Sequence, residues 1–558
     1  MIFRPDRLGR LRYLGRYREI SSVLVKYGFA RVLDRLQLYG LRERLFSLLQ
    51  KRRAGSTPSP EAGLRAALEE LGPAFIKLGQ LLSTRADLLP LSYVEELSRL
   101  QDRVSPFSTA EAKEILAGEL RLDPAELFAF FQPEPLAAAS IGQVHRAVLH
   151  SGEEVAIKIK RPGVDRLVRK DLEILEGVAD FVDRNTYWGE LYRFSRVAGE
   201  LKEIILSELD YNNEARNAER LRRNFAGDPH VYLPRVYRDY TTRNVLTLEY
   251  REGITLNRYL EKPLADPSPE KVAEILSDAF FQQFIVDGFF HGDPHPGNLA
   301  LLPEGRIFFM DFGAAGAINE NSRGKFAAMA RAFQSADTAG LIGELAGFAF
   351  MPPGIDRAEL IRDVEKLQER YLDLPLKSID VGEAVQDFLQ LSAKHRLRFP
   401  HEFLLLARAL VILEGTVARL DPQFNLAGAA AKYAPELQKG YLRFAARRLQ
   451  NTWHRYQRLL ERFPEDAAEL MRASASGDLK VKLELTEVNS IINTVKDSGN
   501  RLGLSIILAS LIIALSRNVK LSFLTWLERI PLGEIILIGA VLTGLWLIWV
   551  TLRSIKLK

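Results

Sequence analysis

The chain has 558 residues, a formal net charge of +5 and no cysteine. This length predicts about three or four structural units. The lack of cysteine excludes disulfide frameworks, thiolate metal sites and cysteine nucleophiles, and it fits a reducing, intracellular setting. No secretory signal is expected, because arginines interrupt the N-terminal segment where an apolar core would be required.

The N-terminal 53 residues concentrate the positive charge. They contain fourteen Lys or Arg and four Asp or Glu, a net charge of +10, which leaves −5 for the rest of the chain. Apolar residues recur among the arginines at roughly helical spacing. We expect residues 1–60 to form a basic amphipathic arm and a linker. This arm either lies on anionic membrane lipids or packs on the protein with a solvated basic face. Nucleic acid is disfavoured as a partner, because no recognition motif accompanies the charge.

Residues 61–130 predict a helical extension. Pro73 marks one helix start, Ser108 with Glu111 forms a capping box, and Asp123-Pro124 marks another start. Within this region, the sequence Lys-x-Gly-Gln places two polar side chains three residues apart, so that they share one helix face and can reach one site together. These side chains are Lys77 and Gln80.

Strand signals follow at 144–149, 154–160 and 245–250. The second contains Val-Ala-Ile-Lys158, the pattern of the strand that carries the phosphate-binding lysine of a kinase. Such a lysine needs a carboxylate to hold it in place. The acidic segment after it offers three, and the pattern alone does not choose among them: Glu208, Asp210 and Glu214.

The loop before this lysine lacks the G-x-G-x-x-G sequence that drapes over the phosphates in protein kinases. It reads Ala137, Ala138, Ala139, Ser140, Ile141 and Gly142. Alanines limit positive φ angles, so any phosphate cradle here must differ from that of a protein kinase. Taken alone, the alanine triplet is also explained as the start of a helix.

Two motifs near the middle of the chain predict phosphoryl-transfer chemistry. The first is His-Gly-Asp-Pro-His-Pro-Gly-Asn at 291–298, and Asp311-Phe-Gly follows it. In kinase-type sites one Asp orients the attacking group, while an Asn five positions on and a second Asp hold the metal ions. Asp293, Asn298 and Asp311 have this type, order and spacing. The apolar run at 306–310 predicts a short strand that places Asp311 at its end, facing a cleft.

Helical texture dominates from about residue 266, and a helical connector is expected at 441–500. Two uncharged apolar runs follow, at 502–516 and 535–552. With fifteen and eighteen residues, they approach the roughly 20 residues that cross a bilayer core. A transmembrane hairpin at 501–553 is favoured over buried helices or a re-entrant segment. Flanking Lys and Arg weakly favour both hairpin ends on the cytoplasmic side.

Together, six motifs in order resemble the UbiB family of atypical kinase-like proteins, which is linked to ubiquinone biosynthesis and prenyl-lipid metabolism. The resemblance covers roughly residues 70–320. The motifs are Lys-x-Gly-Gln at Lys77, the alanine-rich loop, Ala-Ile-Lys158, Glu-x-Asp at Glu208, the 291–298 loop and Asp311-Phe-Gly. A C-terminal membrane hairpin is also the arrangement of bacterial members.

The resemblance implies an α+β fold with the two lobes of an atypical protein kinase. The N-lobe would occupy 131–252 and the C-lobe 253–440, after the helical N-terminal extension and before the C-terminal two-helix transmembrane hairpin.

The resemblance also implies roles for individual residues. Asp293 would occupy the base position, while Lys158 would contact the nucleotide phosphates and pair with Glu214. Asn298 and Asp311 would bind Mg²⁺. Further nucleotide contacts would come from the residues Ala137 to Gly142 and from the backbone of Glu249 to Arg251. Four residues would form a regulatory group folded over the cleft: Lys77, Gln80, Glu208 and Asp210.

The function implied is a membrane-anchored ATPase that uses ATP/ADP and Mg²⁺ and phosphorylates proteins poorly. It would act on, or be driven by, anionic lipids, hydrophobic quinone precursors and quinone-biosynthesis enzymes, at a bacterial inner membrane with its kinase-like domain in the cytoplasm. Two alternatives stay open. One is a small-molecule or lipid kinase, because H-G-D-x-x-x-x-N loops also resemble those of choline and aminoglycoside kinases. The other is a nucleotide-gated scaffold for lipid-biosynthesis enzymes.

Overall fold

The computed structural model describes residues 13–30 and 59–475, apart from short gaps at 84, 86–87, 101–104, 187–188, 190–192, 353 and 376–377. The chain divides into two compact units, residues 1–453 and 454–558, and the described elements lie in the first except for the end of the last helix. The predicted transmembrane hairpin at 501–553 lies outside the described residues. Within the described ranges, every helix is too short or too polar to cross a bilayer.

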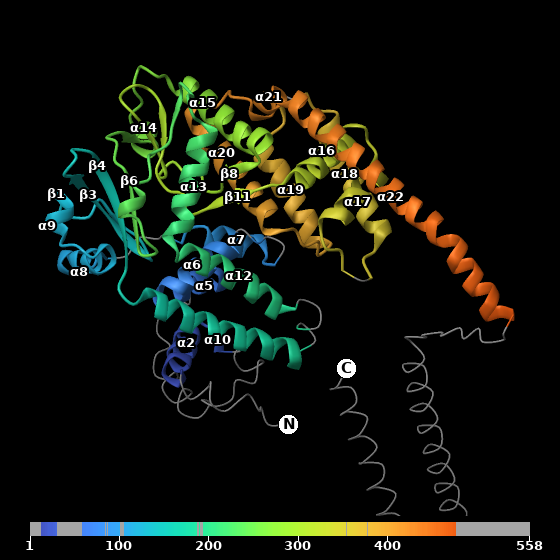
Figure 1. Ribbon diagram of the computed structural model, residues 1–558, viewed down its shortest axis with the longest axis horizontal. Helices are drawn as coiled ribbons and strands as arrows, with labels where there is room; N and C mark the ends of the chain where they lie inside the picture. Colours follow the sequence, from blue (N-terminus) through green and yellow to red (C-terminus); the bar gives the residue numbers. More distant parts are fainter. Residues whose placement is uncertain are drawn as a thin grey trace, which may run out of the picture. The chain divides into compact units, whose positions relative to one another are not determined.

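The N-terminal elements form a helical layer (Figure 1). Its helices are α2 (Leu14–Lys26), α5 (Pro60–Leu71), α6 (Pro73–Leu82) and α7 (Leu91–Leu97). In α2, Arg16 is only 6% exposed and donates hydrogen bonds of 2.8 Å to both carboxylate oxygens of Asp171. At the other end of α2, Lys26 pairs with Glu70 at 2.5 Å. The described part of the basic arm therefore packs on the protein. This agrees with the interpretation of the arm as a helix packed on the protein, rather than one that lies on a membrane.

The extension ends in two short helices and a strand. The helices are α8 (Thr109–Leu120) and α9 (Pro124–Leu127), and the strand is β1 (Phe128–Phe131). Ser108 and Glu111 form the predicted capping box of α8, and Asp123 caps α9 as predicted. β1 pairs with a strand of the following sheet, so the extension and the sheet join inside this strand.

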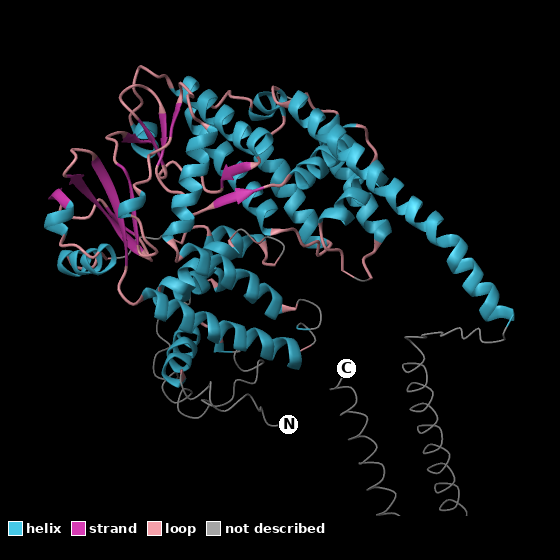
Figure 2. Cartoon of the chain, viewed as in Figure 1, coloured by secondary structure: helices cyan, strands magenta, loops and turns pink. Residues whose placement is uncertain are grey.

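The main sheet has the strand order β1-β3-β4-β6, with β2 paired on β3 (Figure 2). The further strands are β2 (Ala137–Ala138), β3 (Gly142–Leu149), β4 (Glu154–Lys160) and β6 (Val245–Glu249). Residues alternate between the two faces of β4. Val155, Ile157 and Ile159 are fully buried in a core with α8 residues such as Leu116. Lys158 therefore faces the opposite side of the sheet.

Three helices follow β4: α10 (Val164–Asn185), α12 (Phe194–Glu208) and α13 (Tyr211–Asn224). α10 and α12 pack on each other and on α6, whereas α13 contacts the main sheet at β6. The helical structure is interrupted at Leu209 and Asp210, between α12 and α13. The carboxylate of Asp210 accepts a hydrogen bond of 3.0 Å from the Asn212 amide and so caps α13. This break sets the direction of α13, which lies between the main sheet and the second half of the chain (Figure 1).

The second half is mainly helical and contains two small sheets (Figure 2). One sheet has the order β5-β10-β9-β7 and the other pairs β11 with β8. Their strands are β5 (Val231–Tyr232), β7 (Ile254–Thr255), β8 (Phe289–His291), β9 (Leu299–Leu301), β10 (Ile307–Phe309) and β11 (Ala315–Ala317). The 3₁₀ turn η1 (Arg238–Tyr240) precedes β6.

Helices surround these sheets and form most of the core. The α-helices are α14 (Leu256–Glu261), α15 (Pro269–Phe281), α16 (Glu320–Gln334), α17 (Thr338–Phe348), α18 (Arg357–Leu372), α19 (Val381–Lys394), α20 (His401–Leu420), α21 (Leu426–Ala431) and α22 (Ala434–Ala475). A π-helical turn, η2 (Gln282–Asp287), continues α15 and leads into β8. The mixture of sheet and helix confirms the predicted α+β class.

Candidate active site

Lys158 and Glu214 form the central ion pair of the site. The Lys158 ammonium donates to both carboxylate oxygens of Glu214, at 2.9 and 2.8 Å. The lysine side chain is 17% exposed and the glutamate side chain 6% exposed. Of the three carboxylates that the sequence left open, the structure places Glu214 on the lysine, because α13 carries it one turn beyond the Asp210 cap.

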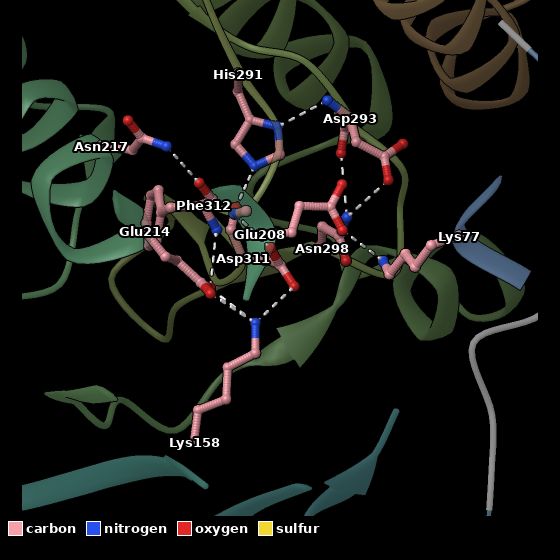
Figure 3. Close-up of polar contacts among 11 residues, drawn as sticks. Lys77, Lys158, Glu208, Glu214, Asn217, His291, Asp293, Asn298, Asp311 and Phe312 are labelled. Carbon is pink, nitrogen blue, oxygen red and sulfur yellow. Dashed lines mark hydrogen bonds and ion pairs between the residues drawn. The ribbon is translucent and has the colours of Figure 1, made fainter. Parts of the chain in front are cut away.

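Asp311 follows β10 and faces the same lysine (Figure 3). Its Oδ2 lies 3.5 Å from the Lys158 ammonium, and its Oδ1 accepts a hydrogen bond of 2.8 Å from the Gly313 amide. Desolvation opposes ionisation of this carboxyl group, but the charge of Lys158 and the Gly313 amide outweigh it and lower the pKa of Asp311 to about 2. Asp311 is therefore an anion at neutral pH, and its side chain is still 46% exposed to the cleft.

Lys158 is likewise charged, as a cation. Burial of the lysine opposes the charged form, but the carboxylates of Asp311 and Glu214 raise the pKa of its ammonium group well above the usual value. The site thus presents one buried cation between two carboxylates. A cation held in this way is suited to bind the phosphates of a nucleotide.

Asp293 is held by groups on two sides. Asn298 donates from Nδ2 to the Asp293 carbonyl at 3.1 Å and to its Oδ2 at 3.4 Å. Arg408, on α20, lies 3.4 Å from Oδ1 of the same carboxylate. Sequence reasoning missed Arg408, which is 115 residues away in the chain and belongs to no motif. Leu405, also on α20, packs closely against the catalytic loop. A Cβ added to Gly292 would lie 2.7 Å from the Leu405 side chain.

His291 ties the two motifs together from a buried position. Its Nδ1 accepts a hydrogen bond of 3.1 Å from the Asp293 amide, so its Nε2 carries the proton that is donated to the Asp311 carbonyl. Burial lowers the pKa of His291, which keeps this neutral tautomer at neutral pH. The His291 amide donates in turn to Gln283 Oε1 at 2.8 Å, in the π-helical turn. The histidine therefore acts as a brace between Asp293 and Asp311 (Figure 3).

The Lys-x-Gly-Gln helix, α6, lies beside this cleft. The Lys77 ammonium is 3.3 Å from the Glu208 carboxylate at the end of α12. Gln80 donates to the Leu100 carbonyl at 3.4 Å. Both side chains, together with Asp293 and Arg408, line a polar cleft of about 490 Å³. Of the four residues predicted as a regulatory group, three lie at this cleft, whereas Asp210 serves as a helix cap.

The alanine-rich loop forms a tight hairpin at the edge of the main sheet. Ala137 pairs with Val144 and Ala138 with Gln143, and the Ala139 amide donates to the Gly142 carbonyl at 2.7 Å. The alternative of a helix start is therefore wrong. Ser140 and Ile141 are buried at the turn. A Cβ on Gly142 would lie 2.6 Å from the Ile159 carbonyl, so only glycine fits the close approach of the hairpin to β4.

The predicted nucleotide-contacting segment Glu249 to Arg251 begins at the last residue of β6. The Glu249 carboxylate accepts hydrogen bonds from the Tyr232 hydroxyl at 2.6 Å and from the Arg235 amide at 3.1 Å. Arg251 pairs with Glu304 at 2.9 Å. Both side chains are therefore occupied by protein partners, and the amides of Glu249 and Tyr250 donate to the carbonyls of Arg235 and Glu154, at 2.8 and 2.9 Å.

Asp311 and Asn298 offer the oxygen atoms that magnesium prefers. Asn298 donates through Nδ2, which directs its other amide atom, the carbonyl oxygen, away from Asp293. In the part of the chain that the structure describes, no cluster of three His, Asp or Glu side chains could hold a metal alone. Magnesium commonly binds through one or two protein oxygens together with phosphates and water. The two residues therefore fit a magnesium ion that binds with a nucleotide.

Three family models match segments of this chain. Residues 99–344 match the ABC1 atypical kinase-like domain, residues 364–425 the UbiB helical domain, and residues 486–553 the ABC1/UbiB kinase-like C-terminal domain. A solved structure of Rv3197 from Mycobacterium tuberculosis, in complex with erythromycin, is 24% identical and covers 63% of this chain and 90% of its own, with a TM-score of 0.44.

Two curated relatives define the family more closely. An uncharacterized protein of Synechocystis sp. is 38% identical over 67% of this chain, and the match spans 64% of that relative, just under two thirds of its length. The probable protein kinase UbiB of Cellvibrio japonicus is 34% identical over 72% of this chain and 73% of its own. The chain therefore belongs to the UbiB-type family of atypical kinase-like proteins.

Proposed function

We propose that the chain is a magnesium-dependent ATPase that is anchored in a membrane and supports ubiquinone or related prenyl-lipid biosynthesis. The observation that carries the proposal is the group formed by Lys158, Glu214 and Asp311 beside Asp293 and Asn298. These residues provide, within one cleft, each of the side chains that phosphoryl transfer needs.

Each side chain would have a defined task. Lys158, fixed by Glu214, would bind the α- and β-phosphates as a permanent cation. Asn298 and Asp311 would hold Mg²⁺, which when bound offsets the charge on the phosphate oxygens. Asp293, held between Arg408 and Asn298, would orient the group that attacks the γ-phosphate, either water or an acceptor hydroxyl.

The position of α6 supports hydrolysis over protein phosphorylation. Lys77 and Gln80 line the cleft on the side of Asp293, where the acceptor must bind. The pairing of Lys77 with Glu208 fastens α6 to α12 there. A cleft of about 490 Å³ that is bounded by these helices admits water or a small molecule. α6 thus occupies the side of the cleft where a segment of a protein substrate would otherwise bind.

The lipid and membrane parts of the proposal rest on family and sequence. The link to ubiquinone biosynthesis comes from the UbiB family, to which the chain belongs together with a relative named probable protein kinase UbiB. The match to the ABC1/UbiB C-terminal domain at 486–553 contains both uncharged apolar runs of the sequence. Membrane anchoring through these runs, at a bacterial inner membrane with the kinase-like domain in the cytoplasm, would bring the site close to hydrophobic quinone precursors.

A second candidate function is phosphorylation of a small molecule or lipid headgroup. The observation that favours it is the presence of two arginines in the cleft that Asp293 lines: Arg408, which lies 3.4 Å from the Asp293 carboxylate, and Arg216. Arginine is suited to bind carboxylate or phosphate groups of an acceptor. A nucleotide-gated scaffold is the third alternative, and it would need binding without turnover.

The test is to follow the γ-phosphate of labelled ATP with the purified full-length protein, magnesium and anionic liposomes. Asp311→Asn removes the metal-binding charge, and Asp373→Asn, at an exposed position outside the site, is the matched control. Free phosphate from the wild type and the control, but not from Asp311→Asn, would support the ATPase. Label on a lipid or small molecule would make the protein a kinase. No turnover under any condition would refute both and favour the scaffold.

A further inference from the structure

A second cavity, of about 430 Å³, lies among the helices that follow the catalytic motifs. Its walls come from α16, α17, α18, α19 and α20, together with Phe284 of the π-helical turn. The side chains that line it are aliphatic or aromatic except for the thioether of Met329, and Tyr371 alone among them carries a hydroxyl group. The volume falls in the range of about 300–1,000 Å³ that small-molecule sites occupy.

Aromatic rings form one wall of this cavity. Phe326 and Phe403 are stacked, with ring centroids 5.3 Å apart, and Phe388 lies 5.6 Å from Phe403. Although these rings sit among packed helices, all three are only partly buried. Ala330, at the rim, is exposed, so the cavity reaches the surface. The rings therefore present apolar surface that another molecule can cover.

The chemistry of the lining defines what can occupy the cavity. The hydroxyl of Tyr371 donates to Asp387 at 2.8 Å, so this one polar group already has a protein partner. Water needs two to four polar partners to be held in a cavity, and this lining does not supply them. A charged ligand would lose its hydration without compensation. A neutral, apolar ligand would instead gain from covering the rings.

We propose that this cavity is a binding site for one neutral ligand with a prenyl or acyl chain. Helix α20 gives the site a direct relation to the catalytic loop. Leu406 and Ala407 line the cavity, whereas their neighbours Leu405 and Arg408 face Gly292 and Asp293. A bound chain would thus contact the same helix that holds Asp293. Binding itself needs no nucleotide, so the site stands or falls independently of ATP hydrolysis.

The experiment uses full-length protein in detergent, without nucleotide, and photoactivatable analogues of two uncharged alcohols, farnesol and hexadecanol. Each analogue carries a diazirine, and the labelled residues are mapped by mass spectrometry. We expect labels on residues of the cavity wall, such as Phe388 and Leu406. Excess unlabelled farnesol or hexadecanol should compete, and the better competitor distinguishes a prenyl chain from an acyl chain.

Variants that fill the cavity make the test specific. Ala384→Trp and Ala407→Phe add bulk to its wall and should reduce labelling there at least about tenfold. Gln390→Trp adds the same indole to an exposed position of α19 outside the cavity and should leave labelling unchanged. Thermal unfolding shows whether each variant is folded, and two independent fillers guard against the loss of one. Labels confined to residues outside the cavity, or labelling that a folded filling variant leaves unchanged, would overturn the proposal.

Discussion

Removing the charge of Lys158 should destabilise the protein strongly and in a pH-dependent way. Lys158→Met keeps most of the length of the side chain but leaves the buried Glu214 carboxylate without its partner. Breaking a buried ion pair from one side costs about 3–5 kcal/mol, because the remaining charge stays desolvated. We expect a loss of that size near neutral pH. Lys366→Met, at an exposed position, is the matched control and should change stability by less than about 0.5 kcal/mol.

The direction of the pH dependence follows from Glu214. Burial already raises the pKa of Glu214 against the attraction of Lys158, and loss of the ammonium group raises it further. The folded variant then retains a proton on Glu214 at pH values where the unfolded chain has lost it. Stability of the variant therefore falls as pH rises from the ordinary carboxyl pKa through the raised one. The loss relative to wild type should be larger at about pH 8 than at about pH 5.

Urea denaturation of wild type, Lys158→Met, Glu214→Gln and the double variant at both pH values measures these free energies of unfolding. Because Glu214→Gln removes the stranded charge, the double variant should recover about 1–3 kcal/mol of the loss seen in Lys158→Met. The reasoning would be refuted if Lys158→Met lost less than about 1 kcal/mol at about pH 8, or if the loss were the same at both pH values.

Three further predictions test other contacts. Gly292→Ala should slow ATP hydrolysis at least about tenfold, because the new Cβ would crowd Leu405 and displace the catalytic loop. Adding Leu405→Ala to this variant should restore part of the rate. Burial raises the pKa of Glu414 from 4.5 to about 7, so wild-type stability should fall as pH rises between these values, and Glu414→Gln should remove this fall in thermal unfolding. Arg16→Met should destabilise by about 3 kcal/mol in urea denaturation, because it strands the fully buried carboxylate of Asp171, and Asp171→Asn in the same chain should recover part of it.

Local patterns in the sequence were sufficient for the elements that carry the chemistry. Alternation of apolar residues predicts the strand of Lys158, and the structure has it at Glu154–Lys160. The capping box at Ser108 likewise marks the start of α8. These features depend on residues within one turn or one strand, where backbone geometry and side-chain periodicity decide the outcome.

The residue pattern alone could not choose among Glu208, Asp210 and Glu214, although the family resemblance implied Glu214. The choice depends on where one helix ends and the next begins. The break after α12 uses Asp210 as the cap of α13 and leaves Glu208 near Lys77. Because the chain changes direction at Leu209, Glu208 lies near Lys77, Asp210 caps α13 and Glu214 pairs with Lys158. Sequence spacing alone treats the segment as one helix and cannot separate them.

Some contacts between distant segments were marked by no sequence pattern. Arg408 reaches Asp293 only because α20 packs against the catalytic loop, and Gln283 reaches the His291 amide only through the π-helical turn. An arginine in a mainly apolar helix is commonly a solvated charge, so nothing local marks Arg408. The alanine triplet misled in another way, because a local preference for helix was overruled by a contact with another segment. Alanine favours helices intrinsically, and pairing with β3 overrides that preference at Ala137 and Ala138.

The two cavities divide the molecule into parts with different chemistry, and α20 is the element that they share. Its polar contact, Arg408 with Asp293, belongs to the cleft of about 490 Å³, while its apolar residues Leu406 and Ala407 belong to the cavity of about 430 Å³. Successive residues of a helix point in different directions, so one helix can face both sites. A shift of α20 on filling the apolar cavity would change the position of Arg408 and hence of Asp293. If the chain hydrolyses ATP as proposed, an apolar molecule in this cavity would act on Asp293 through α20 without entering the nucleotide cleft.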